Sequence, residues 1–309
     1  MLLAFCQIAV CLFLLLTVCI ISRVHAQNWQ IPEVQKWPHE PKRLEHVTGL
    51  ILKYLHSCQA PCVMCLQEVS GDVLKALKSA LATSKNILVF EHQHRRIPRF
   101  WRPNPQNEHV VEREEYIVSI TKNCLGAQKT AGFTYRTDAG KSLLGIKFQV
   151  PVPARDGFEI QQKHSSCESV VVLNTHLRHG RSPQHKDQRD DQLRQLLQVR
   201  ETAQGSSRVH VLAAGDFNSN VSGLPSEFMF SVRSRGDFSL SRLRTRGTED
   251  IDQVFSFSSA AQIVNSRVID VGLLSDHNLV SCSIEFDNPA STVAAATGDN
   301  APMQLPSNC

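Results

Sequence analysis

The fold is decided by the stretch Val209-His210-Val211-Leu212-Ala213-Ala214-Gly215-Asp216-Phe217-Asn218-Ser219. Its first residues are apolar and rich in β-branched side chains, which predicts a short buried strand. Gly215 ends that strand, and Asp216 and Asn218 follow two residues apart, so both side chains can face the same point. An ordinary Asp-Phe-Asn turn is one interpretation. A functional site is the other, because a charged group at the mouth of an apolar strand is costly without a partner.

Further predicted strands carry polar tips of the same kind: Gln67-Glu68, Asn174-Thr175-His176, Asp252 and Asp276-His277. In α/β folds the ligand site lies beyond the strand ends, where groups distant in sequence converge. The carboxylates are not accompanied by a cluster of cysteine thiolates, and this favours Mg²⁺ or Mn²⁺ over zinc as the metal. The two histidines can supply proton transfer or phosphate contacts near neutral pH. Together the tips predict one shared site better than they predict separate polar loops.

The whole chain is an ordinary globular sequence of 309 residues, with 42% hydrophobic and 20% charged residues. Apolar residues at helical spacing predict amphipathic helices over 43–57, 71–83 and 186–203. Short apolar runs predict strands over 62–68, 87–90, 116–121, 142–150, 169–174, 251–255 and 278–286. A first strand is expected over 23–29, ending in Asn28.

Four motifs in this order resemble the endonuclease/exonuclease/phosphatase superfamily, over roughly residues 23–286. They are Leu66-Gln67-Glu68-Val69, Asn174-Thr175-His176-Leu177, Gly215-Asp216-Phe217-Asn218 and Ser275-Asp276-His277. The resemblance implies an α/β fold: a four-layer sandwich of two mixed β-sheets flanked by helices, similar to deoxyribonuclease I. It also implies cleavage of a phosphoester with the help of a divalent metal, Mg²⁺ or Mn²⁺.

The same resemblance assigns roles to individual residues. It implies a catalytic set made of His176, Asp216, Asn218, Asp252, His277 and Glu114. Within this set, Asp252 would fix the tautomer of His277, and Glu114 would be the acidic partner of His176. It implies metal ligation by Glu68 and Asp276, with Asn28 nearby. Whether Asp216 or His277 takes the proton of the attacking water is left open by the sequence.

The N-terminal residues predict entry into the secretory pathway. Residues 2–21 form an apolar run without charge, and Val24-x-Ala26 fits the small-residue rule for signal cleavage. The run is also close to the roughly 20 residues that span a bilayer. We therefore expect a signal peptide or membrane anchor over 1–21, the catalytic domain over 22–286 and a disordered tail over 287–309, so that the protein is secreted or membrane-anchored.

Two arginine-rich loops, 95–102 and 233–246, favour nucleic acid as the substrate, because a polyanion uses several cationic contacts. A lipid-directed phosphodiesterase of the sphingomyelinase type is the alternative, since a basic rim and an anchor also suit anionic lipid. A catalytically silent binding member of the superfamily is a third possibility. Ser219-Asn220 replaces the tyrosine-arginine extension of inositol polyphosphate 5-phosphatases, which argues against that branch. The sequence indicates no protein partner.

Overall fold

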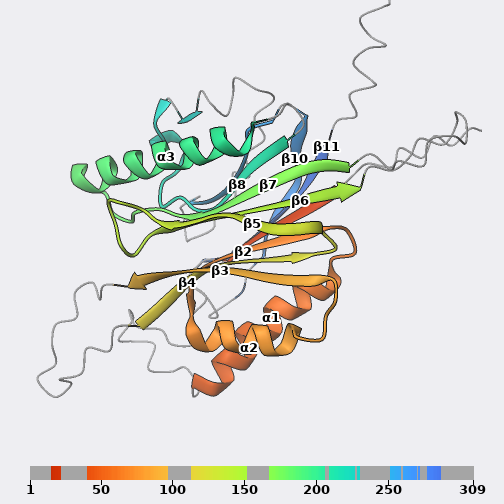
Figure 1. Ribbon diagram of the computed structural model, residues 1–309. Helices are drawn as coiled ribbons and strands as arrows, with labels where there is room; N and C mark the ends of the chain where they lie inside the picture. The colour runs from red at the N-terminus through yellow and green to blue at the C-terminus, as the bar shows by residue number, and fades with distance from the viewer. Residues whose placement is uncertain are drawn as a thin grey trace, which may run out of the picture.

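Two β-sheets packed face to face, with helices on their outer sides, make up the molecule (Figure 1). The computed structural model describes residues 15–21, 40–96, 113–151, 167–205, 209–226, 228–229, 251–258, 260–269, 271 and 277–286. In the figure, α3 covers one sheet and α1 and α2 cover the other, which gives four layers. The predicted four-layer α/β sandwich is therefore confirmed.

One sheet has six strands. Their order is β10 (Ala261–Ile269), β11 (Leu279–Phe286), β1 (Leu15–Ile21), β2 (Cys62–Ser70), β4 (Arg113–Lys122) and β3 (Ile87–Arg96). β1 runs parallel to β2 and antiparallel to β11, and the other neighbours are antiparallel. The sheet is thus mixed, with its parallel pair at the centre.

The second sheet has five strands. Their order is β5 (Leu125–Thr134), β6 (Ser142–Pro151), β7 (Cys167–His176), β8 (Val209–Asp216) and β9 (Asp252–Ser256). Only β7 and β8 pair in parallel among the described strands of this sheet. The carboxyl ends of these two strands therefore lie together, with His176 opposite Asp216.

The helices cover the sheets as their apolar faces dictate. α1 (Glu40–Ser57) and α2 (Gly71–Leu81) bury residues such as Ile51 and Leu77 against the six-stranded sheet. α3 (Pro183–Ala203) buries Leu193 and Leu196 against the five-stranded sheet. Its start is earlier than predicted, because Ser182 caps it by accepting a hydrogen bond from the His185 N–H. A short 3₁₀ helix, η2 (Val221–Gly223), follows β8.

An apolar core between the sheets is completed by a polar bridge near the strand ends. Gln67 Nε2 donates to Asn174 Oδ1 at 2.6 Å, and Asn174 Nδ2 donates to the Val118 carbonyl at 2.8 Å. All these groups are buried, and a buried polar group left without a partner costs about 1–3 kcal/mol. The bridge fixes the ends of β2 and β7 relative to each other, so Asn174 of the Asn-Thr-His-Leu motif joins the two sheets.

The first described strand, β1, is one that the sequence analysis did not predict. β1 occupies Leu15–Ile21, inside the apolar run from which a signal peptide or anchor was expected, and it pairs with both β2 and β11. The expected strand over 23–29, with Asn28, lies outside the described residues. Among the described helices, none combines the length and apolar character needed to cross a membrane. The leader, the tail over 287–309 and the location of the protein stay predictions.

Two further strands, β5 and β10, were also missed by the sequence analysis. Most β5 side chains are exposed or half-buried, and β10 breaks its register between Val264 and Arg267. Both are edge strands. A strand paired on one side only needs neither a continuous apolar run nor strict alternation, and these are the signals that sequence patterns offer.

Candidate active site

The candidate site lies where β2, β7 and β8 end and β9 begins, beside the residue that leads into β11. Glu68 reaches it through a local irregularity: the register of β2 against β4 shifts between Leu66 and Val69. Glu68 has φ 50°, a left-handed value that is uncommon for a residue other than glycine or asparagine. Bulges of this kind re-aim side chains next to active sites. Here the bulge brings the Glu68 carboxylate toward β7 and β8.

Gly215 permits the close approach of β7 and β8 just before the site. Its φ is 145°, and a Cβ at this position would lie 1.9 Å from the Thr175 carbonyl oxygen. No side chain fits there, so glycine is required by both conformation and space. Asp216 follows directly, and its Oδ1 accepts a hydrogen bond from the Asn218 N–H at 2.8 Å. The Gly-Asp-Phe-Asn motif thus builds a tight turn that holds both polar side chains at the site.

A buried histidine–carboxylate pair stands at one side of the site. His277 Nδ1 donates to Asp252 Oδ2 at 2.6 Å, and both side chains are almost completely buried. Because Nδ1 is the donor, Nε2 is the ring nitrogen that can exchange a proton with a substrate. The pair has the geometry of a general acid or base whose tautomer is fixed by an aspartate.

Asp216 is the carboxylate with the most altered acidity. Burial, followed by the nearby Asp252 carboxylate, raises the pKa of Asp216 to about 7. The charges of His277 and Lys141 and the Asn218 N–H lower the pKa of Asp216, but they offset only part of this effect. A carboxyl group with a pKa near neutrality can both accept and release a proton under physiological conditions.

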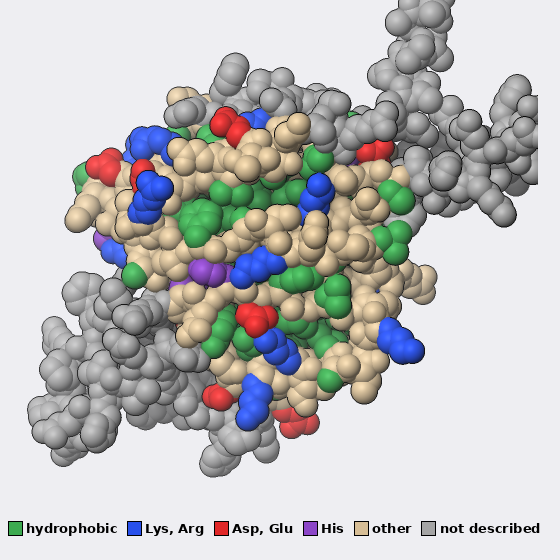
Figure 2. Space-filling view, in the orientation of Figure 1, with side chains coloured by type: hydrophobic (Ala, Val, Ile, Leu, Met, Phe, Trp, Pro, Cys, Tyr) green, Lys and Arg blue, Asp and Glu red, His purple; other side chains and the backbone are tan. Residues whose placement is uncertain are grey.

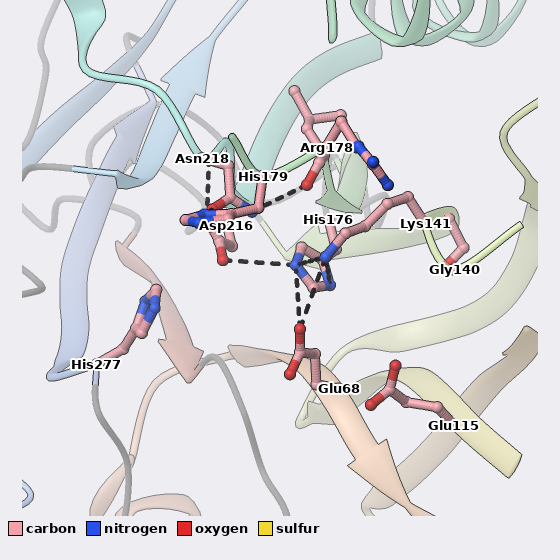
Figure 3. A network of polar contacts seen from close by, with 12 residues as sticks. Glu68, Glu115, Gly140, Lys141, His176, Arg178, His179, Asp216, Asn218 and His277 are labelled. Carbon is pink, nitrogen blue, oxygen red and sulfur yellow. Dashed lines mark hydrogen bonds and ion pairs between the residues drawn. The ribbon is translucent and has the colours of Figure 1, made fainter. Parts of the chain in front are cut away.

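His176 and Lys141 connect Glu68 with Asp216 (Figure 3). His176 Nε2 lies 3.6 Å from Glu68 Oε1 and 3.5 Å from Asp216 Oδ2. Lys141 Nζ makes a short contact with His176 Nε2 and lies 3.6 Å from Glu68 Oε1. The Lys141 side chain is 7% exposed, so its charge acts in a poorly solvated environment. His176 thus lies between the two carboxylates, and the Lys141 ammonium group lies beside His176 and Glu68.

Six predicted site residues converge in the structure: Glu68, His176, Asp216, Asn218, Asp252 and His277. Asp276 and Asn28 lie outside the described residues, and so does the side chain of Glu114. Its neighbour Glu115 is buried, and Glu115 Oε2 lies 3.3 Å from His94 Nε2. The roles of all these residues stay predictions.

The sequence analysis missed three residues with basic side chains, Lys141, Arg178 and His179. Arg178 Nη1 donates to Asp138 Oδ2 at 2.8 Å, which ties the loop before β6 to the loop after β7. His179 Nδ1 lies 2.9 Å from Asn218 Oδ1. The available signals were the Asp138-Ala139-Gly140 turn directly before Lys141 and the position of His179 three residues after His176. Neither signal shows which strand ends face each other.

Comparison with known proteins agrees with this geometry. The sequence model of the Endonuclease/Exonuclease/phosphatase family matches residues 38–277. The chain belongs to the Endonuclease/Exonuclease/phosphatase family. No curated protein sequence matches it at a significant level.

Solved structures share the fold of this family member at low sequence identity. Endonuclease/exonuclease/phosphatase from Beutenbergia cavernae has a TM-score of 0.56 and 18% identity, covering 89% of this chain and 72% of its own. The human nocturnin catalytic domain, with bound sulfate, has a TM-score of 0.55 and 15% identity, and the match covers 88% of this chain and 94% of that domain. A humanized TDP2 from D. rerio has a TM-score of 0.54 and 14% identity, and the match covers 87% of this chain and 98% of that one. These likenesses show the common fold.

The donor atoms at the site of this family member suit a hard divalent cation. Single donor atoms of Asp216, Asp252 and His277 lie within 4.8 Å of one another, and all three residues are buried. Two ligands at right angles on one Mg²⁺ would be about 3 Å apart, so the 2.6 Å contact of His277 with Asp252 is better explained by a shared proton. The remaining carboxylate oxygens, with Glu68 nearby, fit a cation that prefers oxygen.

The raised pKa of Asp216 predicts how stability depends on pH. The unfolded carboxyl ionises near pH 4, whereas the folded one holds its proton until about pH 7. Stability is therefore lost as pH rises from 4 to 7. We expect Asp216→Asn, which cannot ionise, to gain on the order of 2–4 kcal/mol over the native protein at pH 8 in EDTA, with little difference at pH 4. Urea unfolding at both pH values measures this, and an equal difference at the two pH values would contradict it.

Proposed function

We propose that this protein is a divalent-metal-dependent phosphodiesterase, and that its substrate is a nucleic acid. The observation that carries the proposal is the buried His277–Asp252 pair beside Asp216, at an edge that also holds Glu68, His176 and Lys141. This set combines a fixed imidazole, a carboxyl of near-neutral pKa and buried positive charge. Those are the groups that hydrolysis of an anionic ester requires.

The proton transfers are assigned to Asp216 and His277. Water attacks the phosphorus in line with the leaving oxygen, the new P–O bond forms, and the bond to the leaving oxygen breaks. Asp216 takes the proton of the water, because its pKa of about 7 lets it act as a base near neutral pH. His277, held by Asp252 through Nδ1, presents Nε2 and its proton to the phosphate or the leaving oxygen.

Binding of the phosphate is assigned to Lys141, His176 and Asn218. Lys141 is buried beside His176, so its ammonium group can stabilise a phosphate oxygen strongly. Asn218 uses one amide hydrogen on the Leu177 carbonyl at 2.9 Å, and its second amide hydrogen is available for a phosphate oxygen. These donors are fixed before the substrate arrives, which reduces the cost of reorganisation.

The metal is assigned to carboxylate oxygens at the same edge. We propose Mg²⁺ or Mn²⁺, held by Glu68 together with Asp276, which lies outside the described residues. When bound, such an ion neutralises the charge that develops on the phosphate and on the leaving oxygen. The oxygen-rich donor set supports this choice over zinc.

Nucleic acid is supported as the substrate by the arginine-rich segments 95–102 and 233–246, whose side chains lie outside the described residues. On the face seen in Figure 2, described acidic and basic side chains are interspersed rather than gathered into one patch. The human nocturnin domain binds sulfate, an oxyanion similar in shape to phosphate. A polyanion would therefore be recognised by the two arginine segments, and its reacting phosphate by the site.

The substrate class is tested by offering plasmid DNA, RNA, sphingomyelin and bis(4-nitrophenyl) phosphate to the purified protein in Mg²⁺ or Mn²⁺. We expect hydrolysis of nucleic acid, with an activity that falls steeply as the salt concentration rises. Replacement of Arg242, Arg244 and Arg246 by glutamine should make this dependence on salt less steep, by roughly one counterion per lost contact. Cleavage of the small diester should be nearly unchanged in that variant. Hydrolysis of sphingomyelin with no cleavage of DNA or RNA would overturn the nucleic-acid proposal.

A further inference from the structure

His179 contacts a residue of the candidate active site without belonging to any predicted set. Its Nδ1 lies 2.9 Å from Asn218 Oδ1, and its side chain is exposed. Figure 3 shows His179 beside Asn218 and Asp216, away from His277. Asn218 is also held at its other amide atom, because Nδ2 donates to the Leu177 carbonyl. Both ends of this amide are therefore tied to the chain segment that follows β7.

The hydrogen-bonding partners fix the orientation of both side chains. A backbone carbonyl only accepts hydrogen bonds, so Asn218 must present its NH₂ group to Leu177 and its oxygen to His179. An amide oxygen also only accepts, so the hydrogen of the neutral His179 ring must be on Nδ1. His179 is thus expected in the Nδ1–H tautomer, which leaves Nε2 as its second nitrogen.

The backbone on both sides of His179 is anchored. The Arg178 N–H donates to Gln192 Oε1 at 2.8 Å. Arg189 Nη1 donates to the Arg178 carbonyl at 3.0 Å and to the Gly180 carbonyl at 2.8 Å. His179 therefore extends from a loop that α3 holds in place, and supporting groups of this kind preorganise a site.

We propose that His179 is a positioning residue that acts through Asn218. By donating from Nδ1 it prevents rotation of the Asn218 amide, so that the second amide hydrogen stays directed at the phosphate. This inference rests on the proposed function, because the orientation of Asn218 affects turnover only if that amide binds the reacting phosphate. Removal of partners that orient site groups typically costs 10–100-fold.

The first test compares His179→Ala, His179→Asn and His179→Gln in the full chain, with bis(4-nitrophenyl) phosphate as the substrate. Asparagine places an amide NH₂ near the position of Nδ1, whereas glutamine places it farther out. We expect kcat to fall at least tenfold in the alanine and glutamine variants, with KM and the melting temperature nearly unchanged, and to recover to within about threefold in the asparagine variant. His46→Ala, an exposed histidine of α1, serves as the control.

A second measurement does not depend on turnover. Nitrogen-15 NMR of the neutral His179 ring should show the Nδ1–H tautomer, and the Asn218 side-chain amide should exchange its hydrogens faster in His179→Ala. Absence of diesterase activity in the native protein would refute the proposed function, while NMR still tests the contact. A kcat within twofold of the native value in His179→Ala, or the Nε2–H tautomer, would overturn the role of His179.

Discussion

Replacement of Asp252 by asparagine is expected to lower kcat for diester hydrolysis by about 10³-fold or more. Asp252 accepts the Nδ1 hydrogen of His277 at 2.6 Å in a fully buried position. An asparagine removes the negative charge that stabilises the protonated His277 ring, and its NH₂ group can turn toward Nδ1, which a ring with hydrogens on both nitrogens cannot accept. Loss of the correct tautomer in a histidine–aspartate pair costs about 10⁴ in other hydrolases. Steady-state kinetics of the variant measures the effect.

The KM of the Asp252→Asn variant should change little, because the pair acts in the transition state. Asp72→Asn is the matched control, since Asp72 is exposed in the first turn of α2. Circular dichroism should show the same fold in all three proteins. A kcat within tenfold of the native value in Asp252→Asn would show that His277 does not depend on this carboxylate.

Deletion of residues 1–26 is expected to abolish cooperative folding. The chain would then begin at Gln27 and lack β1, which pairs over six residues with β11 and over five with β2. On the order of ten backbone hydrogen bonds, each worth about 1 kcal/mol, would be lost, and typical domains are stable by only about 5–15 kcal/mol. Two sheet edges would also be exposed to aggregation. Thermal unfolding followed by circular dichroism tests this.

Deletion of residues 1–14 is the control for that experiment, because it keeps Leu15–Ile21. This shorter variant should unfold cooperatively at nearly the native temperature. The comparison also bears on the expected signal peptide, since cleavage after Ala26 would remove β1. An active, soluble protein that begins at Gln27 would show that the six-stranded sheet does not need β1.

Glu68, His176 and Asp216 could be predicted from the sequence because each follows an apolar run directly. Asp252 begins β9 and His277 precedes β11, and the family resemblance assigned their roles. Glu68, Asp216 and Asn218 stand beside short buried strands, and parallel strands bring such tips to one edge. Lys141 could not be found in this way, because it precedes β6 instead of following a strand. Its contact with His176 depends on the register of β6 against β7, which places Ser142 opposite His176.

The strand over Leu15–Ile21 was not predicted, for a physical reason. A long apolar run is compatible with a signal peptide, a membrane span or a buried central strand, because each of these segments requires only that apolar side chains are removed from water. The pairing of Leu15–Ile21 with β2 and β11 distinguishes the strand, and pairing is a property of the whole fold. The contact of His179 with Asn218 likewise joins residues 39 positions apart and has no local sequence signal.

The most direct test of the central claim is hydrolysis of bis(4-nitrophenyl) phosphate by the native protein and by Glu68→Gln during a titration with Mg²⁺ or Mn²⁺. The substitution keeps the shape of Glu68 at the bulge of β2 but removes its charge. We expect the native protein to be inactive in EDTA and active with metal. The variant should need much more metal and should be slower by about 10²-fold or more when saturated. Full activity of either protein in excess EDTA would contradict the metal-dependent mechanism.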